Sequence, residues 1–392
     1  MACSRRHKKE ELKADQGLFL HSKTYILIKP HSLFFIRMMI NIGLVGCGVI
    51  SVAHLNAYEI IPEATVVAVC DIDETLASKR AKEYGIRSYY TDFHEMLRSE
   101  EIDVVDVCVP TQYHAQIAVS ALENGKHVIC EKPIAANLEE ADRMIEAARK
   151  SNRLLLIGQS NRFLPMIICM KRLIDAGEVG DLMVVRVAHR FDNPYEKWLS
   201  NPHHPKYHWE KGGGPIIDSG VHGADLSNWL LKDQPSSVFA RGITHPSVLP
   251  FFTSAHIYIE YGNGKYGVIQ IDRATKNYPQ YERYIEVIGS KKMLWGFDNY
   301  YRRTITPHAF LLEKLYATDI LSEHSLTAHK PLIEYLPTYS EIYLELKEFI
   351  NVIINKQPPP VTAEEARKAL EVCIAAEISA RSKKVVSLPL KS

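Results

Sequence analysis

The sequence has almost no net charge, no paired-cysteine pattern and no long apolar run near its start, and each absence excludes a class of protein. The formal net charge is +1, whereas a dedicated nucleic-acid-binding protein needs a basic face. The seven cysteines form no CxxC pair and lie mostly in apolar, strand-like runs, which is typical of a reducing compartment such as the cytoplasm. Nucleic-acid, membrane and disulfide-framework classes are therefore not indicated.

The first 37 residues differ from the rest of the sequence. They contain eight lysines and arginines against three acids. Their apolar stretches, residues 25–28 and 33–36, fall far short of the ~20 residues that cross a bilayer, and no secretory cleavage signal is recognisable. Because Met38 and Met39 directly precede the first strand-like run, we expect residues 1–37 to lie outside the fold, as an upstream start codon would produce. A functional basic arm and an ordered element are the alternatives.

Residues 38–161 alternate between apolar runs and helical patterns. Strands are predicted at residues 40–45, 65–70, 104–109, 127–130 and 154–157, and helices at 51–60, 73–84, 91–97, 114–124 and 137–150. Asn137 and Glu140 form a predicted capping box. Strands that are apolar throughout and separated by helices indicate a parallel sheet covered on both faces. With right-handed crossovers, such an α/β sheet is doubly wound, which is the Rossmann architecture.

After residue 162 the pattern changes. A helix is predicted at residues 165–176, but strands 182–190, 255–261, 266–271 and 284–288 follow with few helices between them, and Gly262-Asn263-Gly264 is a hairpin signal. Residues 162–361 are therefore expected to form an α+β domain with a mainly antiparallel open sheet and a helix at 339–355. The last segment, 362–392, begins with a helix that Thr362 and Glu365 cap.

A glycine-rich turn follows the first strand. Gly46-Cys47-Gly48-Val49-Ile50-Ser51 has serine in place of the third glycine of the dinucleotide fingerprint. The first glycine allows the tight turn, the second lets pyrophosphate approach the backbone, and the third allows close packing of helix on strand, for which serine is small enough. The backbone of Gly46, Gly48, Val49 and Ile50 is therefore predicted to bind the cofactor at a helix N-terminus.

Asp71 ends the second predicted strand, 23 residues beyond Gly48, where an acid is expected to bind the adenosine ribose. A carboxylate here repels a 2′-phosphate, and no arginine follows directly, so NAD is favoured over NADP. The alternative is that Asp71 or Asp73 only caps the next helix.

Several motifs in this order resemble the Gfo/Idh/MocA family, the relatives of glucose–fructose oxidoreductase and inositol dehydrogenase. Besides the glycine turn and Asp71, they are Pro110-Thr111-Gln112-Tyr113-His114, Glu131-Lys132-Pro133, Asn161-Arg162-Phe163 and residues 212–222. The resemblance covers nearly all of residues 40–390. It implies a homodimer or homotetramer formed by the open sheet, a final helix that packs back on the cofactor domain, and cofactor contacts by Pro110, Thr111, His114, Glu131 and Lys132.

The chemistry requires a proton acceptor and a group that steadies the carbonyl oxygen as a secondary alcohol loses its hydride. Lys132 follows the carboxyl end of a strand, where doubly wound folds bind ligands. Asp218 and His222 are four residues apart, so on a helical turn they face the same way, and a histidine titrates near neutrality. The resemblance implies that His222 is the general base, Asp218 binds or assists, and Lys132 binds the hydroxyl.

Two assignments remain open at this point. The resemblance leaves the final holder of the proton open between Lys132 and His222, and it suggests a cis bond before Pro133. Arg162 either binds an anionic substrate or pairs structurally with an acid.

His203, His204 and His208 include a spacing of four, but Pro202 and Pro205 disfavour a helix there and no cysteine or carboxylate completes a metal set, so no metal is predicted.

The sequence thus predicts an NAD(P)-dependent oxidoreductase that transfers hydride between the nicotinamide and a secondary alcohol of a sugar, inositol or sugar derivative. Its expected partners are a small carbohydrate or polyol and copies of itself, with no nucleic acid and no membrane. The alternatives are a cofactor-retaining glycoside hydrolase of the same family and a non-enzymatic dinucleotide-sensing regulator. The intact set of Lys132, Asp218 and His222 favours the enzyme.

Overall fold

The computed structural model describes residues 39–190, 214–245, 251–273, 281–300, 312–319, 333–335 and 340–391. The expected N-terminal extension and the histidines at 203, 204 and 208 lie outside these ranges. Within them, no helix is both long enough and apolar enough to cross a membrane.

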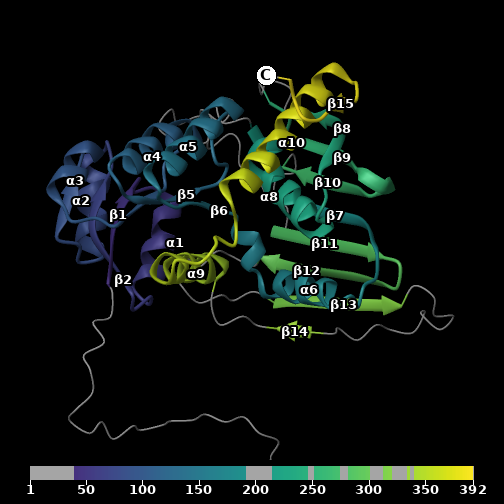
Figure 1. Cartoon of the computed structure of the whole chain (residues 1–392), viewed down its shortest axis with the longest axis horizontal. Helices are drawn as coiled ribbons and strands as arrows, with labels where there is room; N and C mark the ends of the chain where they lie inside the picture. Colours follow the sequence, from purple (N-terminus) through teal and green to yellow (C-terminus); the bar gives the residue numbers. More distant parts are fainter. Residues whose placement is uncertain are drawn as a thin grey trace, which may run out of the picture. The chain divides into compact units, whose positions relative to one another are not determined.

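Six parallel strands form the first sheet, in the order β3-β2-β1-β4-β5-β6 (Figure 1). Its elements are β1 (Ile40–Val45), α1 (Val49–Tyr58), β2 (Ala64–Cys70), α2 (Glu74–Glu83), β3 (Ser88–Tyr90), α3 (Phe93–Ser99), β4 (Val104–Val107), α4 (His114–Glu123), β5 (His127–Glu131), α5 (Leu138–Ser151) and β6 (Leu155–Gly158). The predicted doubly wound sheet is confirmed. Because the strand order reverses between β1 and β4, the loops after these two strands border the crevice where such folds bind ligands.

The side chains at the helix starts explain where several helices of this domain begin. Asp73 opens α2 by accepting hydrogen bonds from the backbone of Thr75 and Leu76. Asn137 opens α5 by accepting from the backbone of Glu140. The predicted capping box at α5 is only half formed, because the carboxylate of Glu140 accepts from Ala136 instead of Asn137. Side chains that bond the free backbone N–H groups of a first turn fix these boundaries.

The second sheet has nine strands in the order β14-β13-β12-β11-β7-β10-β9-β8-β15. They are β7 (Leu182–Arg190), β8 (Pro235–Ile243), β9 (Ser254–Tyr261), β10 (Tyr266–Asp272), β11 (Tyr281–Gly289), β12 (Lys292–Tyr300), β13 (Leu312–Asp319), β14 (Ile333–Tyr335) and β15 (Val386–Ser387). The pair of β7 and β10 is parallel and the other pairs are antiparallel. The mainly antiparallel sheet is confirmed, as is the hairpin at residues 262–264 that joins β9 to β10.

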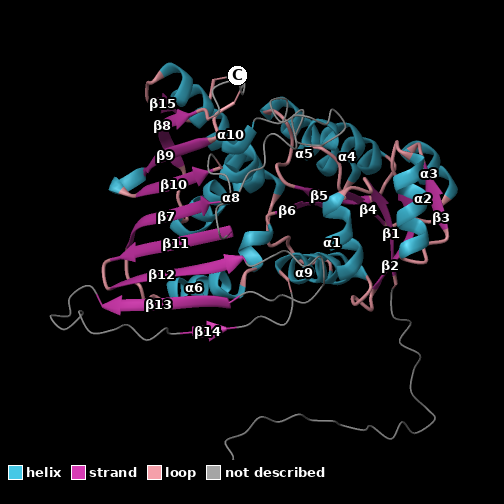
Figure 2. Cartoon of the chain, turned by 180° about the vertical axis from the view of Figure 1, so that it is seen from behind, coloured by secondary structure: helices cyan, strands magenta, loops and turns pink. Residues whose placement is uncertain are grey.

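Helix α8 (Gly214–Leu231) packs directly on this second sheet (Figure 2). Two of its glycines make the close approach possible. A Cβ atom at Gly223 would lie 2.8 Å from Cγ2 of Ile269 on β10, and one at Gly220 would lie 3.2 Å from Cδ1 of Ile271 on the same strand. Larger side chains at these positions would push the helix away, so the glycines determine how deeply the side chains of α8 sit in the molecule.

The C-terminal helices differ from the expected division at residue 361. Helix α9 (Glu341–Asn355) packs on the first domain, where its Leu346 and Phe349 share a buried cluster with Ile40 and Ile42 of β1. The sequence grouped this helix with residues 162–361, whereas its apolar side chains pack on the parallel sheet. The apolar face of α9 covers a part of the parallel sheet that the helices of residues 38–161 leave open.

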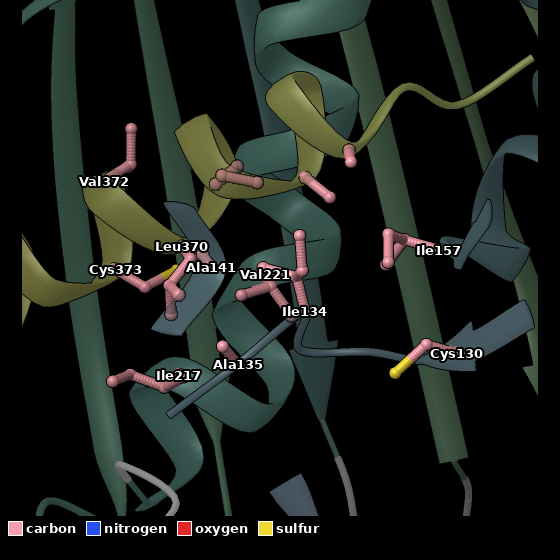
Figure 3. Close-up of a cluster of buried hydrophobic side chains, with 14 of the residues drawn as sticks. Cys130, Ile134, Ala135, Ala141, Ile157, Ile217, Val221, Leu370, Val372 and Cys373 are labelled. Atoms are coloured by element: carbon pink, nitrogen blue, oxygen red, sulfur yellow. The ribbon is translucent and has the colours of Figure 1, made fainter. Parts of the chain in front are cut away.

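Helix α10 (Ala363–Ser382) lies between the two domains. Its predicted capping box of Thr362 and Glu365 is present. Figure 3 shows its residues Leu370 and Cys373 near Ile217 and Val221 of α8 and near Ile134, which follows β5. Arg367 also bonds Asp142 of α5 through two nitrogens, at 2.5 and 3.1 Å. One continuous apolar core thus joins the two domains.

Candidate active site

The glycine turn has the geometry that a dinucleotide needs. Gly46 has a φ of +98°, and a Cβ atom there would lie 2.5 Å from the carbonyl oxygen of Cys108, so only glycine fits. Gly48 precedes α1 without a side-chain cap, which leaves the first N–H groups of that helix free of side-chain partners. Free N–H groups at a helix N-terminus bind phosphate, so the turn fits the pyrophosphate of a dinucleotide.

Ser51, the departure from the fingerprint, fits inside the turn. It is fully buried, and its Oγ donates a hydrogen bond of 2.7 Å to the carbonyl oxygen of Gly48. The hydroxyl is therefore satisfied without a ligand, and the first turn of α1 keeps close contact with the sheet.

Asp71 holds the glycine turn against the end of β2. Its Oδ2 accepts from the backbone of Cys47 at 2.7 Å, and its Oδ1 accepts from Asp73 at 2.9 Å. The cap of α2 is Asp73 and not Asp71. Each carboxylate oxygen has a second lone pair, so Asp71 can accept from the ribose hydroxyls while it fixes the turn.

The loops after β4 and β5 are tied together by His114. Its Nδ1 lies 2.8 Å from the carbonyl oxygen of Pro133, and its Nε2 lies 2.9 Å from that of Val109. The imidazole is buried, and burial lowers the pKa of His114 although the two carbonyls act in the opposite sense. Direct cofactor contact by Pro110, Thr111 and His114 stays a prediction, and the structure adds a positioning role for His114.

Lys132 is brought to the second domain by β5. The bond between Lys132 and Pro133 is cis, as the resemblance suggested. The Nζ atom of Lys132 donates to both the backbone oxygen and Oδ1 of Asp218, each at 3.0 Å. Asp218 and His222 lie one turn apart on α8, so the three residues singled out from the sequence belong to one site at the junction of the domains.

The imidazole of His222 is suited to accept a proton. Burial, followed by the charge of Lys132, lowers the pKa of His222 well below its ordinary value, so the ring is neutral near pH 7. Its Nδ1 is buried and has no hydrogen-bond partner in the described part of the chain. The ring of His189, on β7, lies 5.8 Å away, and burial, followed by the charge of Arg283, lowers the pKa of His189 to about 3.

Sequence reasoning missed Arg273 and His189. Arg273 follows β10 and donates to Oγ of Ser219 at 2.7 Å and to Oδ2 of Asp218 at 3.4 Å. Asp218 thus lies between two cations, Lys132 and Arg273. No local pattern marks either residue, because both reach the site only through the pairing of β7 with β10.

Arg162 pairs with acids, as the structural alternative expected, and binding of an anionic substrate by Arg162 stays a prediction. Its Nε and NH2 bond the two carboxylate oxygens of Asp225 at 2.7 and 2.6 Å, and its NH1 bonds the carbonyl oxygen of Pro360 and Oε2 of Glu365. The residue is 4% exposed. Arg162 thus ties the segment after β6 to α8 and α10.

A glycine turn built for a dinucleotide, with an acid–base group at the domain junction, defines a dinucleotide-dependent oxidoreductase. A family model described as "Oxidoreductase family, NAD-binding Rossmann fold" matches residues 40–159, and one described as "GFO/IDH/MocA C-terminal domain" matches residues 167–295. The chain belongs to the Gfo/Idh/MocA family.

Named relatives and solved structures are similar over most of the chain. Myo-inositol 2-dehydrogenase of Thermotoga maritima is 28% identical over 356 residues, which are 88% of this chain and 98% of that protein. The scyllo-inositol 2-dehydrogenase (NAD(+)) of Bacillus subtilis is 29% identical over 359 residues, 88% of this chain and 97% of that protein. The crystal structure of a probable dehydrogenase from Thermotoga maritima matches with a TM-score of 0.72 and 27% identity, and covers 89% of this chain and 99% of its own.

Proposed function

We propose that this protein oxidises a secondary alcohol of an inositol, or of a related sugar or polyol, with NAD as the acceptor. The observation that carries the proposal is the trio of Lys132, Asp218 and His222 beside the crevice of a dinucleotide-binding fold. The names of the two inositol dehydrogenases support the substrate class, because their similarity extends over both domains.

In this proposal each residue has a stated task. The nicotinamide, when bound, takes the hydride from the alcohol carbon. Lys132 donates a hydrogen bond to the alcohol oxygen and stabilises the negative charge that develops on it. His222, neutral at working pH, accepts the hydroxyl proton, so that the alcohol leaves as a ketone. Asp218 accepts hydrogen bonds from Lys132 and Arg273 and so holds the Lys132 ammonium group in place.

Oxidation of a panel of alcohols tests the function directly. Purified protein with NAD and myo-inositol, scyllo-inositol or related sugars and polyols is expected to give a steady rise in NADH absorbance with one compound class. The proposal fails if no compound produces NADH although calorimetry shows that NAD binds. Sugar release from a glycoside without net NADH would then favour the cofactor-retaining hydrolase, and its absence the dinucleotide sensor.

The preference for NAD over NADP is expected to depend on Asp71. Asp71→Ala should weaken NAD binding by about tenfold, the loss expected for a hydrogen bond to a charged group, and NADP binding much less, because the repulsion of a 2′-phosphate disappears. Isothermal calorimetry with both cofactors measures the ratio.

The neighbouring acid provides the matched control for this prediction. Asp73→Ala removes the cap of α2 and should cost about 1 kcal/mol of stability without changing the ratio of the two affinities. An unchanged ratio in Asp71→Ala would reduce Asp71 to a residue that only holds the turn.

The expected homodimer or homotetramer stays a prediction.

A further inference from the structure

A cluster of buried polar side chains includes Glu131, the residue before Lys132. The proposed reaction does not use this cluster directly. It gathers residues from four parts of the chain: α1, β4 with the residue after it, the end of β5, and α9. Among its members His54 is 1% exposed, Asp106 0% and Glu345 1%. The members are His54, Tyr58, Asp106, Cys108, Glu131 and Glu345.

His54 lies between two carboxylates. Its Nδ1 is 2.8 Å from Oδ2 of Asp106, and its Nε2 is 3.2 Å from Oε1 of Glu131. Carboxylates accept hydrogen bonds and do not donate them, and a neutral imidazole has only one N–H. Both contacts are therefore satisfied only when the ring is an imidazolium.

The charges in the cluster agree with this geometry. Burial opposes a charge on His54, but Asp106 and Cys108 together outweigh it and raise the pKa of His54 well above its ordinary value. Burial likewise opposes ionisation of Glu131, yet the hydrogen bond and charge of His54 hold the pKa of Glu131 below its ordinary value. The imidazolium and the two carboxylates therefore stabilise one another in a buried region.

The remaining members of the cluster stay neutral. Burial raises the pKa values of Cys108 and Tyr58, and the charge of Asp106 raises them further. Burial, followed by the charge of Glu131, raises the pKa of Glu345 well above its ordinary value, and neither oxygen of Glu345 has a partner in the described residues.

A metal ion would be the other way to use these side chains. His54, Asp106 and Cys108 offer ligand atoms that lie within 4.8 Å of one another. A metal needs a thiolate and an imidazole lone pair, whereas the thiol here is protonated and both ring nitrogens face acceptors. The titratable groups that face His54 and Glu131 are Tyr58, Asp106, Cys108, His114, Lys132 and Glu345.

Glu131 connects this cluster to the catalytic lysine. While its Oε1 bonds His54, its Oε2 accepts a hydrogen bond of 3.1 Å from the backbone N–H of Lys132. The chain of contacts runs from Asp106 through His54 and Glu131 to the residue whose Nζ meets Asp218. His54 places this chain of contacts on α1, the helix whose first turn forms the predicted dinucleotide site.

We propose that His54 is a positioning residue that clamps Glu131, and through it the backbone of Lys132, in the orientation that the reaction requires. The inference rests on the proposed function, because it assigns His54 to the same site. It adds to the proposed site a buried residue that acts through Glu131 rather than by touching the substrate. Helix α1 then positions both the glycine turn and, through His54, Lys132.

Two substitutions on α1 separate positioning from packing. Tyr58 donates to the same oxygen of Asp106 as His54, at 2.9 Å, but only His54 bonds Glu131. Both His54→Gln and Tyr58→Phe should lower the temperature of thermal unfolding. His54→Gln should in addition lower kcat per folded molecule by on the order of tenfold to a hundredfold relative to Tyr58→Phe, the scale for a misplaced catalytic group, while the Kd for NAD stays unchanged.

The pH dependence gives two readouts that a packing defect would not move. Loss of His54 should raise the pKa of Glu131, so the acid limb of kcat should move to higher pH in His54→Gln and not in Tyr58→Phe. Because the folded-state pKa of His54 is raised, its stabilisation is complete below its ordinary pKa of 6.5 and is lost as the pH rises through the folded value. The stability lost in His54→Gln should therefore be largest in acid and smaller in alkali.

Each outcome decides something. Equal kcat and equal pH profiles in the two variants would overturn the proposal. If His54→Gln does not fold, the nitrogen chemical shifts of the His54 ring in the wild-type protein decide instead: two protonated nitrogens at neutral pH are expected, and a singly protonated ring would refute the clamp. An inactive wild-type protein would remove the proposed function, yet the ring shifts and the stability profile would still test the link from His54 to Glu131.

Discussion

Lys132→Ala is expected to lower turnover by at least about a hundredfold, the usual scale for a group that acts mainly in the transition state. The ammonium group of Lys132 lies 3.0 Å from Asp218, at the junction where the alcohol oxygen would lie, and water cannot supply a fixed positive charge in its place. The affinity for NAD should remain near normal, because the glycine turn and Asp71 are untouched. Steady-state kinetics with calorimetry of NAD binding measures both quantities.

A second lysine provides the control for this experiment. Lys171 pairs with Asp175 on α6 (Pro165–Asp175), and Lys171→Ala removes the same side chain away from the site. Its turnover should equal that of the wild-type protein. Full activity in Lys132→Ala would show that Lys132 has no role in the mechanism. His222 would then accept the proton without Lys132 as the hydrogen-bond donor to the alcohol oxygen.

Arg162→Met is expected to cost about 3–5 kcal/mol of stability, the usual cost of breaking a buried ion pair by removing one partner. Asp225, at 1% exposure, would be left buried without its charged partner and without the two hydrogen bonds from Arg162. Urea denaturation measures the loss. The double variant Arg162→Met with Asp225→Leu should recover most of it, since no buried charge is then left alone.

The activity of the same variant distinguishes the two interpretations of Arg162. If its role is structural, KM for the substrate stays unchanged in the fraction that folds. A raised KM with unchanged stability would return Arg162 to the substrate site. Arg186→Met is the matched control, because its partner Glu286 lies on a sheet surface where the Arg186 side chain is 40% exposed, and such pairs contribute about 0–1 kcal/mol.

The first domain was predictable because its signals are local. The apolar run of β1 and the glycines after it fix a strand, a turn and a helix within a few residues of one another, and β1 has the predicted bounds. Strands at the outer part of the second sheet, β12 to β14, were not predicted. Their burial depends on neighbouring strands far along the chain, and a single sequence does not carry that information.

The candidate site also contains residues that local signals predict and residues that only distant contacts reveal. Lys132, Asp218 and His222 were found from motif and spacing, and the structure brings Lys132 and Asp218 into contact. The sequence left Arg162 open between a substrate contact and an ion pair, because its partner, Asp225, is 63 residues away in sequence. His54 was not predicted for the same reason, because a histidine within an apolar helix indicates nothing until β4 and β5 place two carboxylates beside it.

Helix α9 makes the cofactor domain discontinuous in sequence. A fragment that ends at residue 161 would leave Ile40 and Ile42 without the cover of Leu346 and Phe349. It would also lose Glu345, a member of the buried polar cluster around His54. The domain could be produced alone only if residues 340–355 were joined to it by a new connection. In a natural gene, exchange of one domain between relatives would therefore require two crossover points, one on each side of the second sheet, rather than a single cut between the halves.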